Sequence, residues 1–144
     1  MGNQIGTALG IIVRPESRIG STDIEILHID AVGNEKVILE RSYSGGQNWF
    51  EDILPVVRNS IDCGITNVIF ELDTIQWINS TGIGALVSFH TAVTKRGGRV
   101  IWSSPHPRTR RLFHLTGLDR QLEISETFVS ALEKITRATS DDGV

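Results

Sequence analysis

An apolar run, a polar turn and a helical pattern follow one another in the middle of the chain, and this succession constrains the fold more than any other feature. Residues 68–72 are rich in branched and aromatic side chains, which is typical of a strand buried on both faces. After Asn79-Ser80-Thr81, apolar side chains recur at helical spacing until Gly97-Gly98 provides a stop signal. This region therefore predicts a central strand whose turn leads directly into a helix. The apolar positions of that helix are Ile83, Leu86, Val87, Phe89 and Val93.

The other patterns predict further strands and helices around this unit. Residues 24–30 and 36–43, joined by a Gly33-Asn34 turn, predict an antiparallel hairpin. The order of elements predicts an α/β fold, a mixed sheet that is antiparallel at the hairpin and mainly parallel after it, packed with about four helices. The remaining predicted elements are a helix from Trp49 closed by Cys63-Gly64, a strand at 99–103, a helix from Pro107 to Gly117 with Leu112, Phe113 and Leu115 buried, a strand at 122–124 and a helix from 125 to 135.

The N-terminal segment has a weaker pattern. Residues 9–13 are apolar enough for a short strand, but Arg14-Pro15-Glu16-Ser17 is expected to break it, and Ser21-Thr22-Asp23 has the composition of a loop. We therefore expect a domain over residues 23–137, with an N-terminal segment 1–22 whose order is left open and a flexible polar tail over 138–144.

Composition and charge reduce the number of possible functions. The chain has 144 residues, enough for one domain, and its net charge of −3 gives no reason to expect direct binding to nucleic acid or to a lipid surface. Cys63 is the single cysteine, which excludes an internal disulfide and a cysteine-rich metal site, and no apolar run is long enough to cross a membrane. We expect a cytoplasmic protein without metal or cofactor, whose oligomeric state the sequence does not determine.

Ser80 and Thr81 lie where the predicted central helix begins. The first turn of a helix has unpaired backbone N–H groups and a partial positive charge, both of which favour anions. A hydroxyl there has two interpretations. It can cap the helix, or it can accept a phosphate that adds about −1.5 to −2 charges without unfolding the domain.

The run from Phe70 to Gly84 resembles the motif of STAS domains, specifically of anti-sigma factor antagonists. Members usually carry Asp-Ser-Ser-Gly-Leu-Gly or Asp-Ser-Thr-Gly-Leu-Gly where this chain has Asn79-Ser80-Thr81-Gly82-Ile83-Gly84. The later stretch Leu115-Thr116-Gly117-Leu118 is similar to the Leu-Thr-Gly-Leu that commonly ends the family's third helix. The resemblance covers about residues 23–135 and implies the STAS fold.

The resemblance also implies a mechanism. In the family, the hydroxyl before the first glycine is phosphorylated by a cognate anti-sigma factor that is also a serine/threonine kinase, and this position is Thr81, with Ser80 as the second choice. The unphosphorylated protein would bind that kinase and free the sigma factor, phosphorylation would end the binding, and a phosphatase would reset the switch. The resemblance therefore implies that the protein is a regulator and not an enzyme. Its implied partner-binding residues are Asn79, Ser80, Thr81, Gly82, Ile83 and Gly84.

Two departures from the family pattern bear on these expectations. Asn79 replaces the usual Asp, which removes a negative charge beside the phosphosite, and residues 40–46 lack the Gly-Glu-Leu-Asp-like turn that often follows the second strand. The alternatives are a STAS subunit of a stress-signalling scaffold or of a lipid-transport ABC complex. A small enzyme with a Ser80 or Thr81 nucleophile is a remote alternative, because the chain has no Gly-x-Ser-x-Gly elbow.

Other polar and aromatic residues have structural interpretations. Glu71 and Asp73 are expected to be solvated at a strand end, and Arg108, Arg110 and Arg111 to form a solvated helix face that is a less favoured candidate for an acidic partner or a phosphate. His90 and His114 are expected to be packed or surface residues. Trp49, Phe50 and Trp77 are expected in the core or at its rim.

Overall fold

The computed structural model describes residues 8–18, 20–30, 34–44, 49–75 and 80–142. Its strands are β1 (Gly10–Arg18), β2 (Ser21–Ile29), β3 (Glu35–Ser44), β4 (Asn67–Glu71), β5 (Arg99–Ser103) and β6 (Glu123–Ser125). Its helices, over the same residues, are α2 (Trp49–Asp62), α3 (Ser80–Lys95), α4 (Pro107–Thr116) and α5 (Phe128–Asp142), with a short 3₁₀ turn η1 (Leu118–Arg120).

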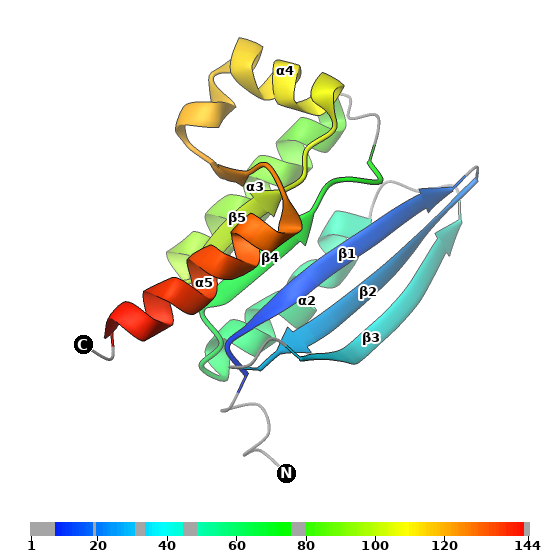
Figure 1. The fold of residues 1–144 in the computed structure, drawn as a ribbon. Coiled ribbons are helices and arrows are strands. Elements are labelled where there is room, and N and C mark those ends of the chain that lie inside the picture. Colours follow the sequence, from blue (N-terminus) through cyan, green and yellow to red (C-terminus); the bar gives the residue numbers. More distant parts are fainter. Residues whose placement is uncertain (1–7, 19, 31–33, 45–48, 76–79, 143–144) are drawn as a thin grey trace.

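The strands form one mixed sheet in the order β3-β2-β1-β4-β5-β6 (Figure 1). The β3-β2 and β2-β1 pairs are antiparallel, and the β1-β4, β4-β5 and β5-β6 pairs are parallel. The predicted fold class, a mixed sheet with an antiparallel start, later parallel strands and about four helices, is therefore confirmed.

The predicted break at Arg14-Pro15 is wrong, because β1 continues through it to Arg18 and pairs with β2 over its whole length. Thr74 Oγ1 donates a hydrogen bond to the Pro15 carbonyl oxygen, so the backbone of Pro15 faces away from β2. The missing N–H of proline therefore costs no bond of the β1-β2 ladder. The predicted loop at residues 21–23 is likewise part of β2, opposite residues 16–18.

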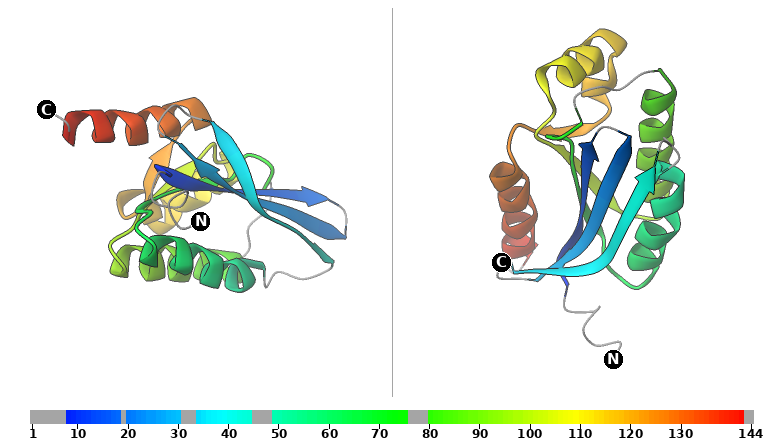
Figure 2. Two further views of the ribbon diagram at one scale, coloured as in Figure 1. Left: turned by 90° about the horizontal axis from the view of Figure 1, so that it is seen from below. Right: turned by 90° about the vertical axis from the view of Figure 1, so that its right-hand side faces the viewer.

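The sheet is covered on both faces by helices, but unequally. In Figure 2, α2 and α3 lie on one face and α5 on the other. Successive side chains of a strand point to opposite faces of the sheet, so the core consists of two clusters. In β1, Ile11 and Val13 belong to the larger cluster under α2 and α3, and Ile12 belongs to the smaller cluster under α5. The smaller cluster consists of Ile12, Leu27, Ile29, Ile69, Ile101, Ala131 and Ile135.

Most element boundaries agree with the sequence, and the differences have local causes. Helix α4 buries Thr109 and Phe113, four residues apart, so Leu115 lies on its outer side with 70% of its surface exposed, contrary to the prediction. The last helix continues to Asp142, beyond the position where a polar tail was expected to begin. The domain limits 1–22, 23–137 and 138–144 stay predictions.

Candidate functional site

The segment that leads from β4 to α3 is tied to the sheet by hydrogen bonds. The backbone N–H of Leu72 donates to Ser103 O at 2.9 Å, and that of Ile75 donates to Leu72 O at 3.0 Å. Thr74 adds the bond to Pro15 O described above. The chain is thereby held at the carboxyl end of β4 as far as Ile75. The predicted site residue Asn79 and the aromatic Trp77 lie outside the described residues.

Helix α3 begins at Ser80, so Ser80 and Thr81 occupy its first turn, as the sequence predicts. This turn has no acidic side chain. The positive end of the helix dipole is therefore not neutralised by a carboxylate from the turn itself. Such a helix end favours an anion. The side chains of Ser80 and Thr81 lie outside the description.

The next residues of the motif differ in their surroundings. Ile83 is half-buried and packs against the larger core cluster. Gly84 is exposed, and a Cβ atom built on it would meet nothing within 4 Å. Close packing of the helix on the sheet therefore does not explain Gly84. It leaves open space one turn after Thr81, where another molecule can approach the helix backbone.

Aromatic packing holds α3 on the sheet. Phe89 lies edge-on to Phe70 of β4 with ring centroids 5.3 Å apart, and its ring centroid is 5.9 Å from that of Trp102 of β5. Trp102 Nε1 donates to His90 Nδ1 at 3.1 Å, which requires an unprotonated Nδ1. Burial lowers the pKa of His90 and so favours that form. The contacts of Phe89 and His90 therefore fix α3 on the sheet between two and three turns after its first residue.

Glu71 departs from its prediction. It is 6% exposed instead of solvated, and its Oε1 accepts a 2.6 Å hydrogen bond from Ser103 Oγ. Its Oε2 lies 3.6 Å from Arg14 Nε. Burial raises the pKa of Glu71, with a smaller contribution from the charge of Asp73, against the hydrogen bond from Ser103 and the charge of Arg14. Asp73 is exposed, as expected. The sequence gives little indication of the contact between Arg14 and Glu71, because Arg14 is in the segment that is expected to break the first strand.

Among the remaining candidates, those whose side chains are described lie as the sequence predicts. Arg108, Arg110 and Arg111 are exposed on α4, and Arg110 forms an ion pair with Glu126. His114 is exposed and lies 2.9 Å from Asp119. Trp49 is in the core, with its ring centroid 5.9 Å from that of Phe70, whereas the side chain of Phe50 lies outside the description.

The described residues were also compared with the requirements of a metal site and of a membrane-spanning helix. They contain no group of three or more His, Cys, Asp or Glu side chains arranged to hold a metal ion. None of the helices in this part of the chain is long and apolar enough to span a membrane.

Comparison with known proteins agrees with the fold and the motif. A model of the STAS domain matches residues 35–131. A protein of Thermotoga neapolitana, provisionally named as an anti-sigma factor antagonist and homologue of TM1081, is 31% identical over 72 residues, which cover 50% of this chain and 64% of the relative. A Thermotoga maritima protein with the same provisional function is 28% identical over 74 residues, which cover 51% of this chain and 66% of that protein. The chain thus matches slightly less than two thirds of either relative's length.

A solved structure is similar over a comparable region. The NMR structure of the protein TM1081 superposes with a TM-score of 0.53 and 25% sequence identity, covering 62% of this chain and 69% of that one.

Proposed function

Since the chain belongs to the STAS domain family, we propose that it acts as an anti-sigma factor antagonist, a partner-switching regulator controlled by phosphorylation of Thr81. Unphosphorylated, it binds an anti-sigma factor that is also a serine/threonine kinase, and the sigma factor is released. A phosphate on Thr81, or on the neighbouring Ser80, ends the binding, and a phosphatase restores it. The protein works in the bacterial cytoplasm, as a substrate of the kinase and without catalysis of its own.

The observation that carries the proposal is the start of α3 at Ser80, with two hydroxyl residues in a first turn that has no acidic side chain. A phosphate at this end is compatible with the helix, because backbone N–H groups and the helix dipole favour it. The fold can therefore stay intact while the surface gains about −1.5 to −2 charges.

The open surface at Gly84 supports a partner that docks over the first two turns of α3. Placing an unpaired anion in such an interface costs several kcal/mol, and each ~1.4 kcal/mol weakens binding about tenfold. One phosphate therefore suffices for release. Asn79 in place of Asp does not prevent transfer, because the base and the metal ions for phosphoryl transfer come from the kinase.

The first test is an affinity capture from lysate of the native host, with wild type, Thr81→Glu and Thr91→Glu as baits. Thr91 is an exposed threonine further along the same helix, so Thr91→Glu controls for an added charge on α3. We expect wild type and Thr91→Glu to retain a protein with a histidine-kinase-like ATPase domain, and Thr81→Glu to lose it.

A second step assigns the phosphosite. The captured kinase is purified and incubated with radiolabelled ATP and each of three substrates, wild type, Ser80→Ala and Thr81→Ala. We expect label on the first two and none on Thr81→Ala, with the reverse pattern for the two variants if Ser80 is the acceptor. Retention of the same transporter or scaffold components by all baits, or turnover of a substrate without any kinase, would overturn the proposal.

A further inference from the structure

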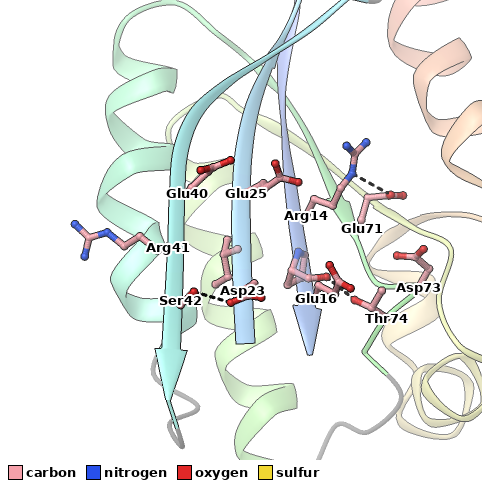
Figure 3. Close-up of a pocket in the computed structure, with 12 residues that line it drawn as sticks. Arg14, Glu16, Asp23, Glu25, Glu40, Arg41, Ser42, Glu71, Asp73 and Thr74 are labelled. Atoms are coloured by element: carbon pink, nitrogen blue, oxygen red, sulfur yellow. Dashed lines mark hydrogen bonds and ion pairs between the residues drawn. The ribbon is translucent and has the colours of Figure 1, made fainter. Parts of the chain in front are cut away.

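Part of the sheet face that carries α5 is left uncovered. Helix α5 contacts β4, β5 and β6, and its core cluster reaches β1 and β2 only at Ile12, Leu27 and Ile29. Beyond these residues, the same face of β1, β2 and β3, with the end of β4, lines a half-open depression of about 690 Å³ (Figure 3). This volume is within the range of about 300–1,000 Å³ usual for ligand sites.

Carboxylates dominate this depression, which we call the acidic groove. Its lining includes six acidic residues and two arginines, an excess of four negative charges, although the whole chain has a net charge of only −3. Arg41 points away from the other side chains in Figure 3, so Arg14 is the cation that faces the groove. The six acidic residues are Glu16, Asp23, Glu25, Glu40, Glu71 and Asp73.

The carboxylates lie opposite one another across strands. Glu25 of β2 pairs in register with Glu40 of β3, and Glu16 of β1 with Asp23 of β2. Like charges directly opposite each other destabilise a sheet. Within the described parts of the chain, the side chains of Glu25 and Glu40 form no ion pair and no hydrogen bond, although the charge of Glu25 acts on Arg14 from a longer distance. A cation that bridges the two strands would remove this repulsion.

The chain itself shows which cation this face accommodates. Arg14 Nη1 donates to Glu35 Oε1 at 2.9 Å, Arg14 Nε lies 3.6 Å from Glu71 Oε2, and the guanidinium carbon lies 5.2 Å from the ring centroid of Phe128. Burial acts to lower the pKa of Arg14, but the hydrogen bond and charge of Glu35, with the charges of Glu71 and Glu25, raise it overall. A guanidinium with its planar set of donors thus bridges two strands at the edge of the groove.

We propose that the acidic groove binds an arginine- or lysine-rich segment of a partner protein, which lies on the uncovered face of β1, β2 and β3. On β2 the carboxylates of Asp23 and Glu25 are two residues apart, which is about 6.7 Å along a strand and also the spacing of alternate side chains in an extended peptide. The same arrangement does not suit a small metal ion, since the described residues hold no cluster of three ligands. The groove lies on the sheet face opposite α3, although Asp73 and Thr74 at its edge belong to the segment that leads to α3. We expect its occupancy not to depend on the proposed phosphorylation.

The test uses a fluorescently labelled peptide of alternating arginine and serine, with glutamine in place of arginine as the control peptide. Fluorescence anisotropy measures its affinity for the full chain at low and high salt. We expect Glu25→Gln/Glu40→Gln to weaken binding at least about tenfold, and higher salt to weaken wild-type binding, because the attraction is electrostatic.

The matched control is Glu51→Gln/Asp52→Asn, which removes two exposed charges from α2 on the other face of the sheet. We expect it to change the affinity by less than about twofold. Equal losses in both double variants would show attraction to net charge alone and would overturn the proposal, as would the absence of arginine-dependent binding.

Two further measurements separate folding and function from this result. Amide chemical shifts of the wild-type protein should change on peptide addition at Asp23, Glu25, Glu40 and Ser42, and a map confined to other residues would contradict the proposal. Thr81→Glu should bind the peptide like wild type. The partner-switch proposal and the acidic groove can therefore fail independently.

Discussion

At the level of single residues, the buried Glu71 and the half-buried His90 are two titratable side chains that make stability depend on pH. Glu71 is hydrogen-bonded to Ser103 Oγ on one side and faces Arg14 on the other, and burial raises its pKa. His90 accepts the indole N–H of Trp102, and burial lowers its pKa. In both cases burial shifts the equilibrium toward the uncharged form, but the two side chains affect stability in opposite directions as pH changes.

For Glu71, the folded state binds more protons than the unfolded state above the ordinary pKa of glutamic acid, so its contribution to stability falls as pH rises. Glu71→Gln keeps an acceptor for Ser103 and removes this titration. We expect the variant to be more stable relative to wild type at about pH 7 than at about pH 4, that is, its free energy of unfolding minus that of wild type is larger at the higher pH. Urea unfolding at both pH values measures it, and an unchanged difference would contradict the burial of an ionisable carboxyl.

For His90 the sign is reversed. Its lowered pKa means that the unfolded state binds more protons as pH falls below about 6.5, so the folded state loses stability in acid. His90→Gln can still accept from Trp102 and does not titrate. We expect the variant to lose less stability than wild type between about pH 7 and about pH 5. Equal losses in thermal melts at the two pH values would exclude His90 as a source of the pH dependence.

At the scale of elements, α3 combines a fixed body with an exposed beginning. Phe89 is 1% exposed and anchors the helix against β4 and β5, whereas Gly84 faces open space. A glycine inside a helix costs roughly 1 kcal/mol relative to alanine. The presence of Gly84 at an open position thus weakens the helix without a compensating packing contact, which is expected where a surface serves a partner.

Gly84→Ala should therefore stabilise the protein and impair partner binding. We expect a gain of up to about 1 kcal/mol, or about 2–4 °C in melting temperature, because the new methyl group meets no atom. We also expect weaker capture of the anti-sigma factor in the affinity experiment. Ser88→Ala, at another exposed position of α3, is the control that should leave capture unchanged. If Gly84→Ala binds like wild type, the partner does not contact this turn.

At the scale of the whole molecule, β1 joins the two parts of the sheet. It lies between β2 and β4, and Ile11, Ile12 and Val13 are fully buried. The approach to β4 is close, since a Cβ atom on Gly10 would lie 2.7 Å from Asn67 O. Without β1, the antiparallel hairpin and the parallel strands would have no common hydrogen-bonded partner.

A chain of residues 23–144 should therefore not fold cooperatively, whereas residues 8–144, which retain β1, should unfold in one transition like the full chain. Gly10→Ala should cost about 1–3 kcal/mol, because the new Cβ atom is too close to a backbone oxygen to be accommodated without a shift of the strand. Circular dichroism with thermal and urea melts tests all three. A cooperative transition in 23–144 would mean that β1 is an accessory of the domain and not its centre.

The features that depend on neighbouring residues could be predicted from the sequence. Hydrophobic periodicity predicted the β2-β3 hairpin, β4, the four helices and the position of Ser80 and Thr81 at the start of α3, since an element that buries one face records this in its own spacing. The features that depend on residues distant in the chain became visible only in the three-dimensional structure. Pro15 continues a strand because its backbone faces Thr74, and Glu71 is buried because Ser103 and Arg14 come from two other strands. The acidic groove exists because α5 covers one part of a sheet face and leaves the rest open, and no local pattern encodes how far a helix reaches.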